Sequence, residues 1–435
     1  MRAGRRYTNW LGNVAFTPSA YEEPADEAAV VALVRRAQQE GRRLRVVGGG
    51  HSWSAGIETD GYLLSLDRMA RVLSVDPLRH QVTVQAGIRL RELSAQLHQR
   101  GLALLNLGSI QEQSLAGAIS TGTHGTGLQF GVLATQVLGL RLVTGTGEVV
   151  EYTADRDPEL LDAARVSLGA LGVITQVTLQ VAPAFNLREE RTPLPLAEAL
   201  ALVPGRLGEA DHIKLWWLPH AGRVQVYRQY RTKESPRARR GLLSEDTRTA
   251  QEVFRALLAL GSAFPRLISP IQRFLSRVQF TASSHIGPSF QVFSLAMPPR
   301  HHESEYAVPL PRAAAAVKAL HELIEARRHR VHFILELRFV KKDSAWLSPA
   351  YERDVCFIGA YDANRRGWPG FRRDYEELMR SYEGRPHWGK EFTASADSLR
   401  AAYPRWEDFQ RLRRRLDPAG VFMNRHLQQV FGLGR

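Results

Sequence analysis

The residues best suited to chemistry lie in one short loop near the start of the chain. An apolar run at 44–47 leads into three glycines at 48–50, and His51 and Ser52 follow directly. Glycine lets a backbone approach a ligand closely and adopt a positive φ without steric cost. Successive N–H groups in such a turn form a concave surface that binds anions. The loop predicts a phosphate-binding site with an imidazole at its exit, although a glycine turn without a ligand explains this one stretch equally well.

A second glycine-rich stretch, at 116–127, favours the phosphate-binding interpretation. Two loops of small and hydroxyl-bearing residues suit a long ligand with several phosphates that lies between two backbone walls. Two common nucleotide-binding motifs are excluded. Trp53 stands where the last glycine of G-x-G-x-x-G would be, and no Gly-Lys-Ser/Thr follows the glycines as it does in an NTPase P-loop.

Two stretches of the second half combine charged and aromatic residues. In 332–339, a period of two places Glu336 and Arg338 on one face of a strand. The opposite face is then expected to carry Phe333, Leu335, Leu337 and Phe339. A carboxylate beside a guanidinium matches the hydroxyls of a polyol, which both donate and accept hydrogen bonds; the alternative is an ordinary ion pair on a solvent face. The stretch 387–392 packs rare residue types together, and a tight aromatic turn with an exposed lysine also explains it.

Short strands and capped helices should position the two glycine-rich loops. Asp26 caps a helix that ends near Gly41, and a strand then enters the first loop, which gives a β-α-β-like start. The other elements expected in this half are strands at 62–66, 72–75 and 82–84, a helix at 88–97, a hairpin over 137–152, a helix from Asp157-Pro158 and a strand at 173–181.

The second half has a different sequence pattern. Alternating apolar residues predict an antiparallel hairpin over 213–226. Residues 231–250 are polar and basic and contain Pro and Gly, so they predict a surface loop. A basic helix near the C-terminus should end at the turn 417–424.

Length and composition predict a globular protein of two domains. The chain has 435 residues, which exceeds one ordinary core, with 44% hydrophobic and 23% charged residues. The single cysteine, Cys356, excludes an intramolecular disulfide and suits a reducing compartment, so we expect the cytoplasm. No apolar region follows the basic residues 1–6 before Pro18, which argues against a secretory signal, and the run at 256–264 is too short to span a bilayer.

The chain is strongly basic, with a net charge of +14 and a pI near 10.2. Basic residues gather at 228–240 and 411–415. No nucleic-acid motif and no interleaved aromatic platform accompany them, so we expect no nucleic-acid partner. Contact with an anionic membrane surface stays open, while solvated faces of an arginine-rich chain are the simpler explanation.

The order of these motifs resembles the vanillyl-alcohol-oxidase family of flavoproteins. Within it, the chain is most similar to sugar-1,4-lactone oxidases of the L-gulonolactone and D-arabinonolactone type, with alditol oxidases next. The resemblance covers nearly the whole chain, and the order of the blocks is more specific than any one of them. The blocks are Thr8-Asn9-Trp10, 46–52, 106–109, 121–125, 131–136, 215–220, 336–338, 346–351 and 387–390.

This resemblance implies an α+β fold of two domains. Residues 1–183 would bind FAD, residues 184–405 would form a sheet-based cap that binds the substrate, and residues 406–435 would return to the FAD domain. No metal is implied. Gly108 would lie near the flavin C4a, where a glycine is similar to the oxidases and a bulkier residue hinders oxygen.

The resemblance also implies how FAD is held. The first loop would cradle the pyrophosphate, and His51 would be joined covalently to the 8α carbon of the flavin; a non-covalent histidine near the ring is the alternative. The cofactor-binding residues implied are Val46, Val47, Gly48, Gly49, Gly50, His51, Ser52, Gly108, Ser109, Ser114, Gly117, Thr121, Gly122, Thr123, His124, Gly172, Val173 and Ile174.

The implied reaction takes a hydride from a carbinol carbon of an aldono-1,4-lactone to flavin N5, and O₂ becomes hydrogen peroxide. Arg338 and Lys390 would stabilise the developing alkoxide, because fixed positive charge is strongest in a water-excluded site. Glu336 would hold neighbouring hydroxyls, and Ser109 would bond the substrate or the ring edge. Glu303 aligns loosely with another hydroxyl-binding position.

Three alternatives remain open: an alditol oxidase, a flavin dehydrogenase that passes electrons to a quinone or cytochrome, and a non-catalytic basic binding module. The intact set of Glu336, Arg338 and Lys390 argues against the last. Tyr361 falls where an alditol oxidase has a small threonine, which weakens the alditol assignment. Two further departures from the family are a longer basic loop at 231–245 and Val355, where relatives often have a hydroxyl residue.

Overall fold

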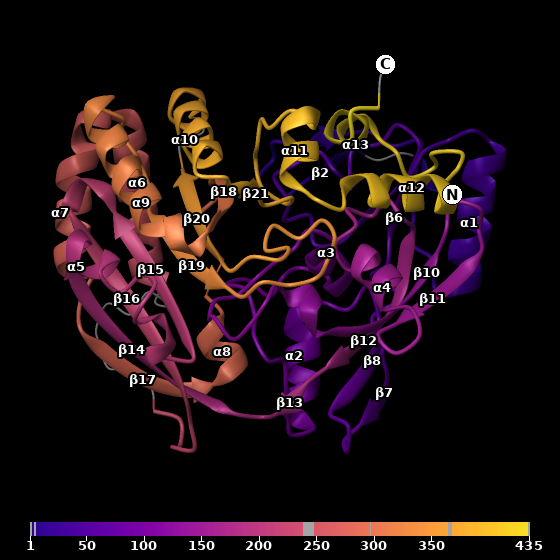
Figure 1. The fold of residues 1–435 in the computed structure, drawn as a ribbon, viewed down its shortest axis with the longest axis horizontal. Coiled ribbons are helices and arrows are strands. Elements are labelled where there is room, and N and C mark those ends of the chain that lie inside the picture. Colours follow the sequence, from indigo (N-terminus) through magenta and orange to yellow (C-terminus); the bar gives the residue numbers. More distant parts are fainter. Residues whose placement is uncertain (1, 4–5, 238–247, 296, 364–367, 434–435) are drawn as a thin grey trace.

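The computed structural model describes residues 2–3, 6–237, 248–295, 297–363 and 368–433. The N-terminal half, in indigo to magenta, lies beside a half that contains one large sheet, and the yellow C-terminal segment lies over the N-terminal half (Figure 1). None of the helices in these ranges is long and apolar enough to cross a membrane.

Small sheets and short helices build the N-terminal half. Its strands are β1 (Arg2–Ala3), β2 (Tyr7–Thr8), β3 (Ala15–Phe16), β4 (Ala20–Glu22), β5 (Leu44–Val47), β6 (Tyr62–Ser65), β7 (Val72–Asp76), β8 (Gln81–Gln85), β9 (Leu102–Ala103), β10 (Val137–Val143), β11 (Val149–Thr153), β12 (Val173–Gln180) and β13 (Ala182–Pro183). Its α-helices are α1 (Glu27–Gln39), α2 (Leu90–Gln99), α3 (Leu115–Ser120) and α4 (Pro158–Arg165).

The predicted β-α-β start is confirmed. Strands β4 and β5 both pair in parallel with β6, in the order β1-β4-β6-β5. Asp26 caps α1 by accepting from the backbone N–H of Ala29 at 2.8 Å. The predicted 137–152 hairpin is the β10–β11 pair, inside an antiparallel sheet of order β11-β10-β12-β8-β7. The chain thus delivers β5 directly into the first glycine-rich loop.

The second half is built on one sheet of eight strands. Its strands are β14 (Asn186–Pro195), β15 (His212–Leu218), β16 (Arg223–Thr232), β17 (Ser283–Pro288), β18 (His302–Pro309), β19 (Leu335–Val340), β20 (Val355–Asp362) and β21 (Arg385–Pro386). Their order is β17-β14-β16-β15-β19-β20-β18-β21, and neighbouring strands are antiparallel. We call it the cap sheet.

Helices accompany the cap sheet and close the chain. They are α5 (Leu196–Leu200), α6 (Arg248–Ala263), α7 (Ile268–Val278), α8 (Ser289–Phe293), α9 (Ala313–Ala326), α10 (Pro369–Ser381), α11 (Ala396–Ala402), α12 (Trp406–Leu416) and α13 (Arg425–Val430). Leu335, Leu337 and Phe339 of β19 pack in one core with α9 and α10. Since side chains alternate along a strand, the opposite face of β19 is free for other contacts.

Two sequence predictions are wrong in this half. The loop expected over 231–250 is shorter at both ends, because β16 continues to Thr232 and α6 begins at Arg248; its middle, 238–247, lies outside the described residues. Phe333 was expected on the face of β19 opposite Glu336. Because β19 begins only at Leu335, the alternation does not reach Phe333, and its ring lines the same cavity as Glu336.

The C-terminal segment packs on the N-terminal half. Residues of α12 and α13 belong to the same core as β5, β6 and α1. The backbone N–H of Leu44 donates to Val421 at 2.8 Å, and the buried Arg45 guanidinium donates to the carbonyl oxygen of Phe422 at 2.7 Å. These contacts fix the strand that enters the first glycine-rich loop.

Candidate active site

Strand alternation places a row of polar and aromatic side chains on one face of the cap sheet. Glu336 and Arg338 on β19 share this face, and the register pairs Glu336 with Trp216 on β15. Glu336 also pairs with Gly359 on β20. Two residues further along β20, Tyr361 pairs with Glu303 on β18. The neighbouring strands β15, β19, β20 and β18 therefore direct these residues into a single cavity of about 270 Å³.

Glu336 is held by three donors. Its Oε1 accepts from Trp216 Nε1 at 2.8 Å, and its Oε2 accepts from the hydroxyl of Tyr361 at 2.7 Å. Arg338 Nη2 contacts both oxygens, at 2.9 and 3.0 Å. Burial opposes ionisation of this carboxyl, but the charges of Arg338 and Lys214 and the hydrogen bonds from Trp216 and Tyr361 together lower the pKa of Glu336. The group is a fixed carboxylate and not a surface ion pair.

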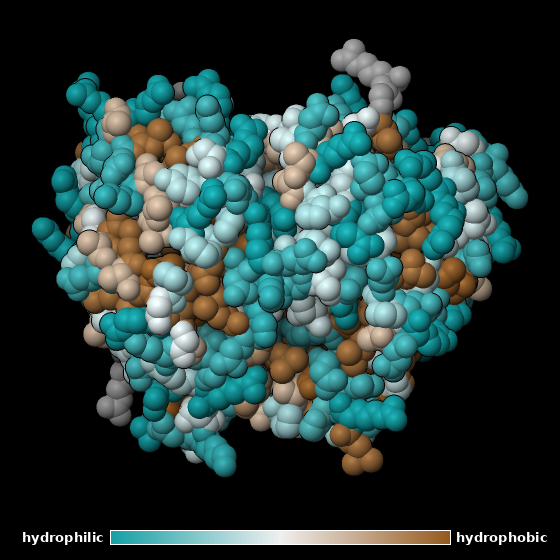
Figure 2. All heavy atoms as spheres, in the orientation of Figure 1, coloured by the Kyte–Doolittle hydropathy of each residue, from teal (hydrophilic) through white to brown (hydrophobic). Residues whose placement is uncertain are grey.

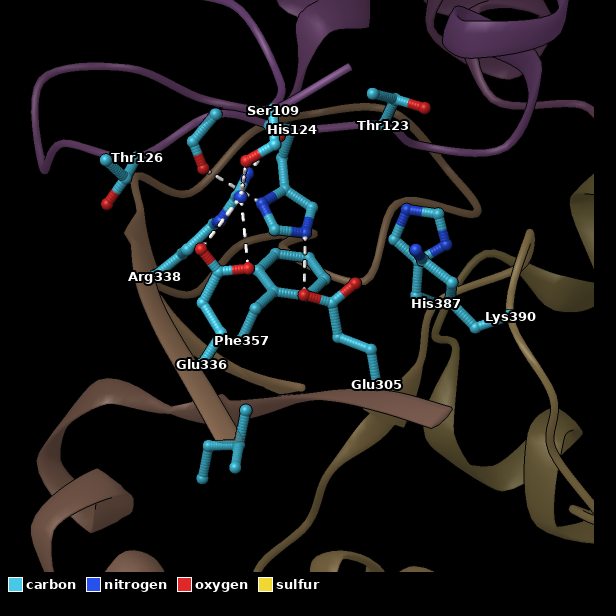
Figure 3. Close-up of polar contacts among 12 residues, drawn as sticks. Ser109, Thr123, His124, Thr126, Glu305, Glu336, Arg338, Phe357, His387 and Lys390 are labelled. Carbon is cyan, nitrogen blue, oxygen red and sulfur yellow. Dashed lines mark hydrogen bonds and ion pairs between the residues drawn. The ribbon is translucent and has the colours of Figure 1, made fainter. Parts of the chain in front are cut away.

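Arg338 connects the cap sheet to the N-terminal half. Its Nη2 donates to Ser109 Oγ, and its Nη1 donates to the backbone carbonyl of His124 at 3.4 Å. Figure 3 shows Arg338 and Glu336 rising from β19 toward Ser109. Burial disfavours the charged guanidinium, yet Glu336 raises the pKa of Arg338, so it stays cationic. A permanent cation is thus fixed in the wall of the cavity.

Lys390 occupies another part of the same cavity. Its ammonium forms an ion pair with Glu303 and lies 4.0 Å from the centre of the Trp53 ring. Burial opposes ionisation of Glu303, but Lys390 lowers the pKa of this carboxyl to about 2. Arg338 and Lys390 were expected to act on one alkoxide; each has a carboxylate partner of its own, and both line the cavity.

A buried cluster of His124, Glu305 and His387 lies behind these pairs. His124 Nε2 is 3.3 Å from Glu305 Oε1, and the His124 ring stacks on Phe357 with 3.6 Å between centroids. Among the described residues, these three groups have ligand atoms within 4.8 Å of one another, as a metal site would need. Burial lowers the pKa of His387 to about 3, so its ring is neutral. His124, named from the sequence as a flavin contact, therefore also binds the cap sheet.

A second cavity, of about 130 Å³, follows the first glycine-rich loop. A Cβ at Gly48 would lie 2.0 Å from Ser114 Oγ, and a Cβ at Gly49 would lie 2.5 Å from the carbonyl oxygen of Glu112. Gly50 has a φ of +67°, in the left-handed region. Gly48 and Gly49 are required because the segment 112–114, just before the second glycine-rich stretch, packs directly on the first loop. Residues of both stretches line the cavity.

His51 stands where the two cavities meet. His51, Ser52, Gln113 and Thr121 line both of them. The Nδ1 atom of His51 is buried and has no hydrogen-bond partner among the described residues. Burial lowers the pKa of His51 to about 4, so its imidazole is neutral and nucleophilic at pH 7. Two cavities that share His51, a backbone cradle along one of them and an orphaned ring nitrogen between them fit a dinucleotide such as FAD.

Most of the residues named from the sequence line these cavities. Those along the second cavity are Val46, Val47, Gly48, Gly49, Gly50, His51, Ser52, Ser114, Gly117, Thr121, Gly172 and Ile174. Those along the first are His51, Ser52, Gly108, Ser109, Thr121, Thr123, His124, Glu303, Glu336, Arg338 and Lys390. Gly122 and Val173 line neither cavity: a Cβ at Gly122 would meet Pro349 at 3.4 Å, and Val173 is fully buried in the core.

Sequence reasoning did not identify Trp216 and Glu305 as site residues. Strand alternation could have identified Trp216. Leu215 and Trp217 face the core, so Trp216 lies on the opposite face of the strand, toward the cavity. Glu305 follows Glu303 at a spacing of two on β18, so it shares the same face. The contact of Glu305 with His124 joins distant parts of the chain, and no local pattern signals it.

Fold and site together define a two-domain, FAD-binding oxidoreductase. Residues 18–153 match the family described as FAD binding domain, and residues 177–430 match the family described as D-arabinono-1,4-lactone oxidase. The chain belongs to the D-arabinono-1,4-lactone oxidase family.

Relatives agree with this assignment, and a solved structure has the same fold. The chain is 35% identical over 434 residues to L-gulonolactone oxidase of Bos taurus, with 98% of each chain covered. It is 35% identical over 429 residues to L-gulono-1,4-lactone dehydrogenase of Mycobacterium tuberculosis, covering 98% of this chain and 99% of that one. Cholesterol oxidase from Brevibacterium sterolicum has the same fold, with a TM-score of 0.83, 19% identity, and 98% and 97% of the two chains covered.

Proposed function

We propose that the protein is an aldonolactone oxidase, which oxidises a carbinol carbon of an L-gulono- or D-arabinono-1,4-lactone with O₂ as acceptor and hydrogen peroxide as product. The observation that carries this proposal is the buried Glu336–Arg338 pair, which faces the cavity beside Ser109. The relatives named for such lactones are similar along the whole chain, which supports the same substrate class.

The chain's own residues bind and orient the substrate. The cationic Arg338 donates hydrogen bonds and stabilises negative charge on the reacting oxygen, while Glu336 accepts from neighbouring hydroxyls. Lys390 supplies a second positive charge, and Ser109 anchors the substrate or the cofactor edge. When bound, FAD supplies the redox chemistry: it takes the hydride and both electrons pass on to O₂, which with two protons becomes hydrogen peroxide.

We propose that FAD lies along both cavities, with its pyrophosphate in the glycine cradle at 48–50 and His51 joined covalently to its 8α carbon. The orphaned Nδ1 of His51 and the low pKa of its ring support this link. The remaining cofactor contacts are those named from the sequence, of which Gly122 and Val173 have the least support. We further propose the domain limits 1–183, 184–405 and 406–435, and a cytoplasmic location.

An alditol oxidase is the less favoured alternative. The half-buried Tyr361 donates a hydrogen bond to Glu336, and its ring fills space at this end of the cavity. Where a small residue stood instead, an extended polyol would have more room. We therefore expect L-gulono-1,4-lactone to be oxidised with a higher kcat/KM than xylitol. The Tyr361→Thr variant should show a smaller difference between these two kcat/KM values.

A dehydrogenase is the second alternative, and the relative in Mycobacterium tuberculosis carries that name. The deciding experiment mixes the enzyme anaerobically with L-gulono-1,4-lactone, follows flavin absorbance, and then admits air. Reduction by the lactone, followed by rapid reoxidation and stoichiometric hydrogen peroxide, supports the oxidase. Reduction without reoxidation by air identifies the dehydrogenase, and no reduction by either lactone removes the substrate assignment.

A further inference from the structure

Most of the large apolar side chains exposed on this protein lie in one helical hairpin. Among the described residues, eight large hydrophobic side chains are exposed, and six of them lie between residues 253 and 278. These six are Val253 (51%), Leu260 (40%), Phe264 (59%), Leu267 (38%), Phe274 (53%) and Val278 (38%). They belong to α6, the connection 264–267 and α7, which together we call the α6–α7 hairpin. Figure 2 shows hydrophobic residues at the surface of the half that contains the cap sheet.

The exposed side chains follow helical spacing. Val253, Leu260 and Phe264 are separated by seven and four residues, and Leu267, Phe274 and Val278 repeat the same separations. Residues three, four and seven apart lie on one side of a helix. Each helix of the hairpin thus presents an apolar stripe to solvent, not a scatter of single residues.

The protein covers the neighbouring part of the same apolar face. Phe254 and Leu258 of α6 and Ile268 and Leu275 of α7 line the active-site cavity. Gln272 Nε2 donates to the carbonyl oxygen of Val331 at 2.8 Å, which ties α7 to the cap. A helix turns by about 100° per residue, so the covered residues lie about 90° around each helix from the exposed ones. The apolar face is therefore wider than the part that the described chain covers, and its outer edge is exposed.

The charge of the hairpin indicates what covers the outer edge. Arg255, Arg266, Arg273 and Arg277 are all exposed beside the stripes. Between residues 248 and 302 the sequence contains one acidic residue, Glu252. Exposed apolar side chains flanked by four arginines and a single carboxylate match the interface of an anionic bilayer, where arginines bind headgroups and apolar residues enter the acyl boundary.

We propose that the α6–α7 hairpin docks the protein on an anionic lipid surface. The apolar stripes enter the bilayer interface and the four arginines bind lipid phosphates. In this orientation the hairpin is the wall between the bilayer and the apolar end of the cavity that holds Glu336 and Arg338. The inference does not depend on which donor or acceptor the site uses.

Vesicle binding of the flavin-loaded enzyme tests this proposal. The hairpin variant Phe264→Glu/Phe274→Glu is compared with Leu73→Glu/Leu78→Glu, which replaces the two remaining exposed hydrophobic residues and changes the net charge equally. We expect the parent and the Leu73/Leu78 variant to sediment with phosphatidylglycerol-containing vesicles. The hairpin variant should bind them roughly tenfold or more weakly, and its activity in lipid-free buffer should not change.

Three outcomes overturn the proposal. If both double variants bind the vesicles equally weakly, the binding depends on the net charge of the whole chain. No binding of the parent to the anionic vesicles removes the docking surface. A dimer of the parent that becomes monomeric only in the hairpin variant, measured by light scattering, assigns the stripes to a second copy. Melting temperature and flavin content verify folding, and Val253→Glu against Leu78→Glu replaces the pair if the hairpin variant unfolds.

Discussion

Arg338 Nη2 lies 2.9 and 3.0 Å from the two carboxylate oxygens of Glu336, and the same nitrogen donates to Ser109 Oγ in the other half of the molecule. One cation therefore both neutralises the carboxylate of the cap sheet and reaches the loop beside the second glycine-rich stretch. Glu336 and Arg338 are buried, with 4% and 7% of their surface exposed. Such a pair positions charge without the reorganisation that water would need.

Arg338→Met should slow flavin reduction by lactone by roughly 10² to 10³-fold, because the fixed cation beside the reacting oxygen is lost. The reduction rate of Arg338→Lys should lie between those of the parent and Arg338→Met, since a lysine keeps the charge but not the planar guanidinium. Stopped-flow reduction measures both variants. A reduction rate within about twofold of the parent for Arg338→Met would exclude this role.

Loss of stability must be separated from loss of catalysis in this variant. Removing Arg338 leaves the buried Glu336 charge unpaired, which costs about 3–5 kcal/mol. The double variant Glu336→Gln/Arg338→Met removes both charges and should recover much of the melting temperature. It should not recover the reduction rate, and recovery of both would show that Arg338 acts only through folding.

His51→Ala should abolish covalent attachment of the flavin, because no other group takes the place of its buried ring nitrogen. The measurement is the flavin absorbance of the pellet after acid precipitation. The matched control is His426→Ala, another half-buried histidine, which lines the second cavity but not the first. We expect covalent flavin to persist in that control. Flavin that stays in the pellet of His51→Ala would refute the assignment.

Gly48→Ala should lower both flavin content and melting temperature, since its Cβ would lie 2.0 Å from Ser114 Oγ. In Gly48→Ala/Ser114→Ala the nearest obstacle is removed, so part of the flavin content should return. Gly56→Ala is the control, because its Cβ would meet its nearest atom only at 3.7 Å. Absorbance at saturating FAD and thermal melting measure the three variants. Full flavin content in Gly48→Ala would mean that the loop relaxes without harm to the cradle.

Local patterns were sufficient for the parts of the site that one element determines. The Asp26 cap, the strand into the glycine loop and the shared face of Glu336 and Arg338 all follow from spacing within a few residues. The limits of β10, Val137–Val143, coincide with the predicted strand.

Contacts between distant segments could not be predicted in the same way. The contact of His124 with Glu305 depends on how the cap meets the N-terminal half. The pairing of Lys390 with Glu303 joins two segments of the second half that lie 87 residues apart in the sequence. Phe333 was assigned to the wrong side because alternation was extended past the beginning of β19. The sequence expectations did not include the helices α6 and α7, although the apolar residues of both recur at helical spacing.

The Lys390–Glu303 pair predicts a dependence of stability on pH. Burial opposes ionisation of Glu303, but Lys390, with a smaller contribution from His301, lowers its pKa to about 2 from an ordinary value of 4.5. A carboxyl with a depressed pKa in the folded state stabilises the fold above its unfolded pKa, and this contribution is lost as the pH falls through the folded pKa. The melting temperature of the parent should therefore fall between about pH 4.5 and pH 2, in part because this pair is lost.

Lys390→Met should reverse the sign of the contribution that ionised Glu303 makes to the stability of the fold. Without the ammonium, burial is the largest remaining influence on Glu303 and raises its pKa. A raised carboxyl pKa favours the fold at low pH and loses that benefit as the pH rises, so the variant should be most destabilised near neutral pH and approach the parent on acidification. Thermal melting from acidic to neutral pH measures the difference, with the exposed Lys341→Met as control. A difference between variant and parent that does not change with pH would contradict the pairing, whereas a slower reduction by lactone at every pH would report the separate catalytic role of Lys390.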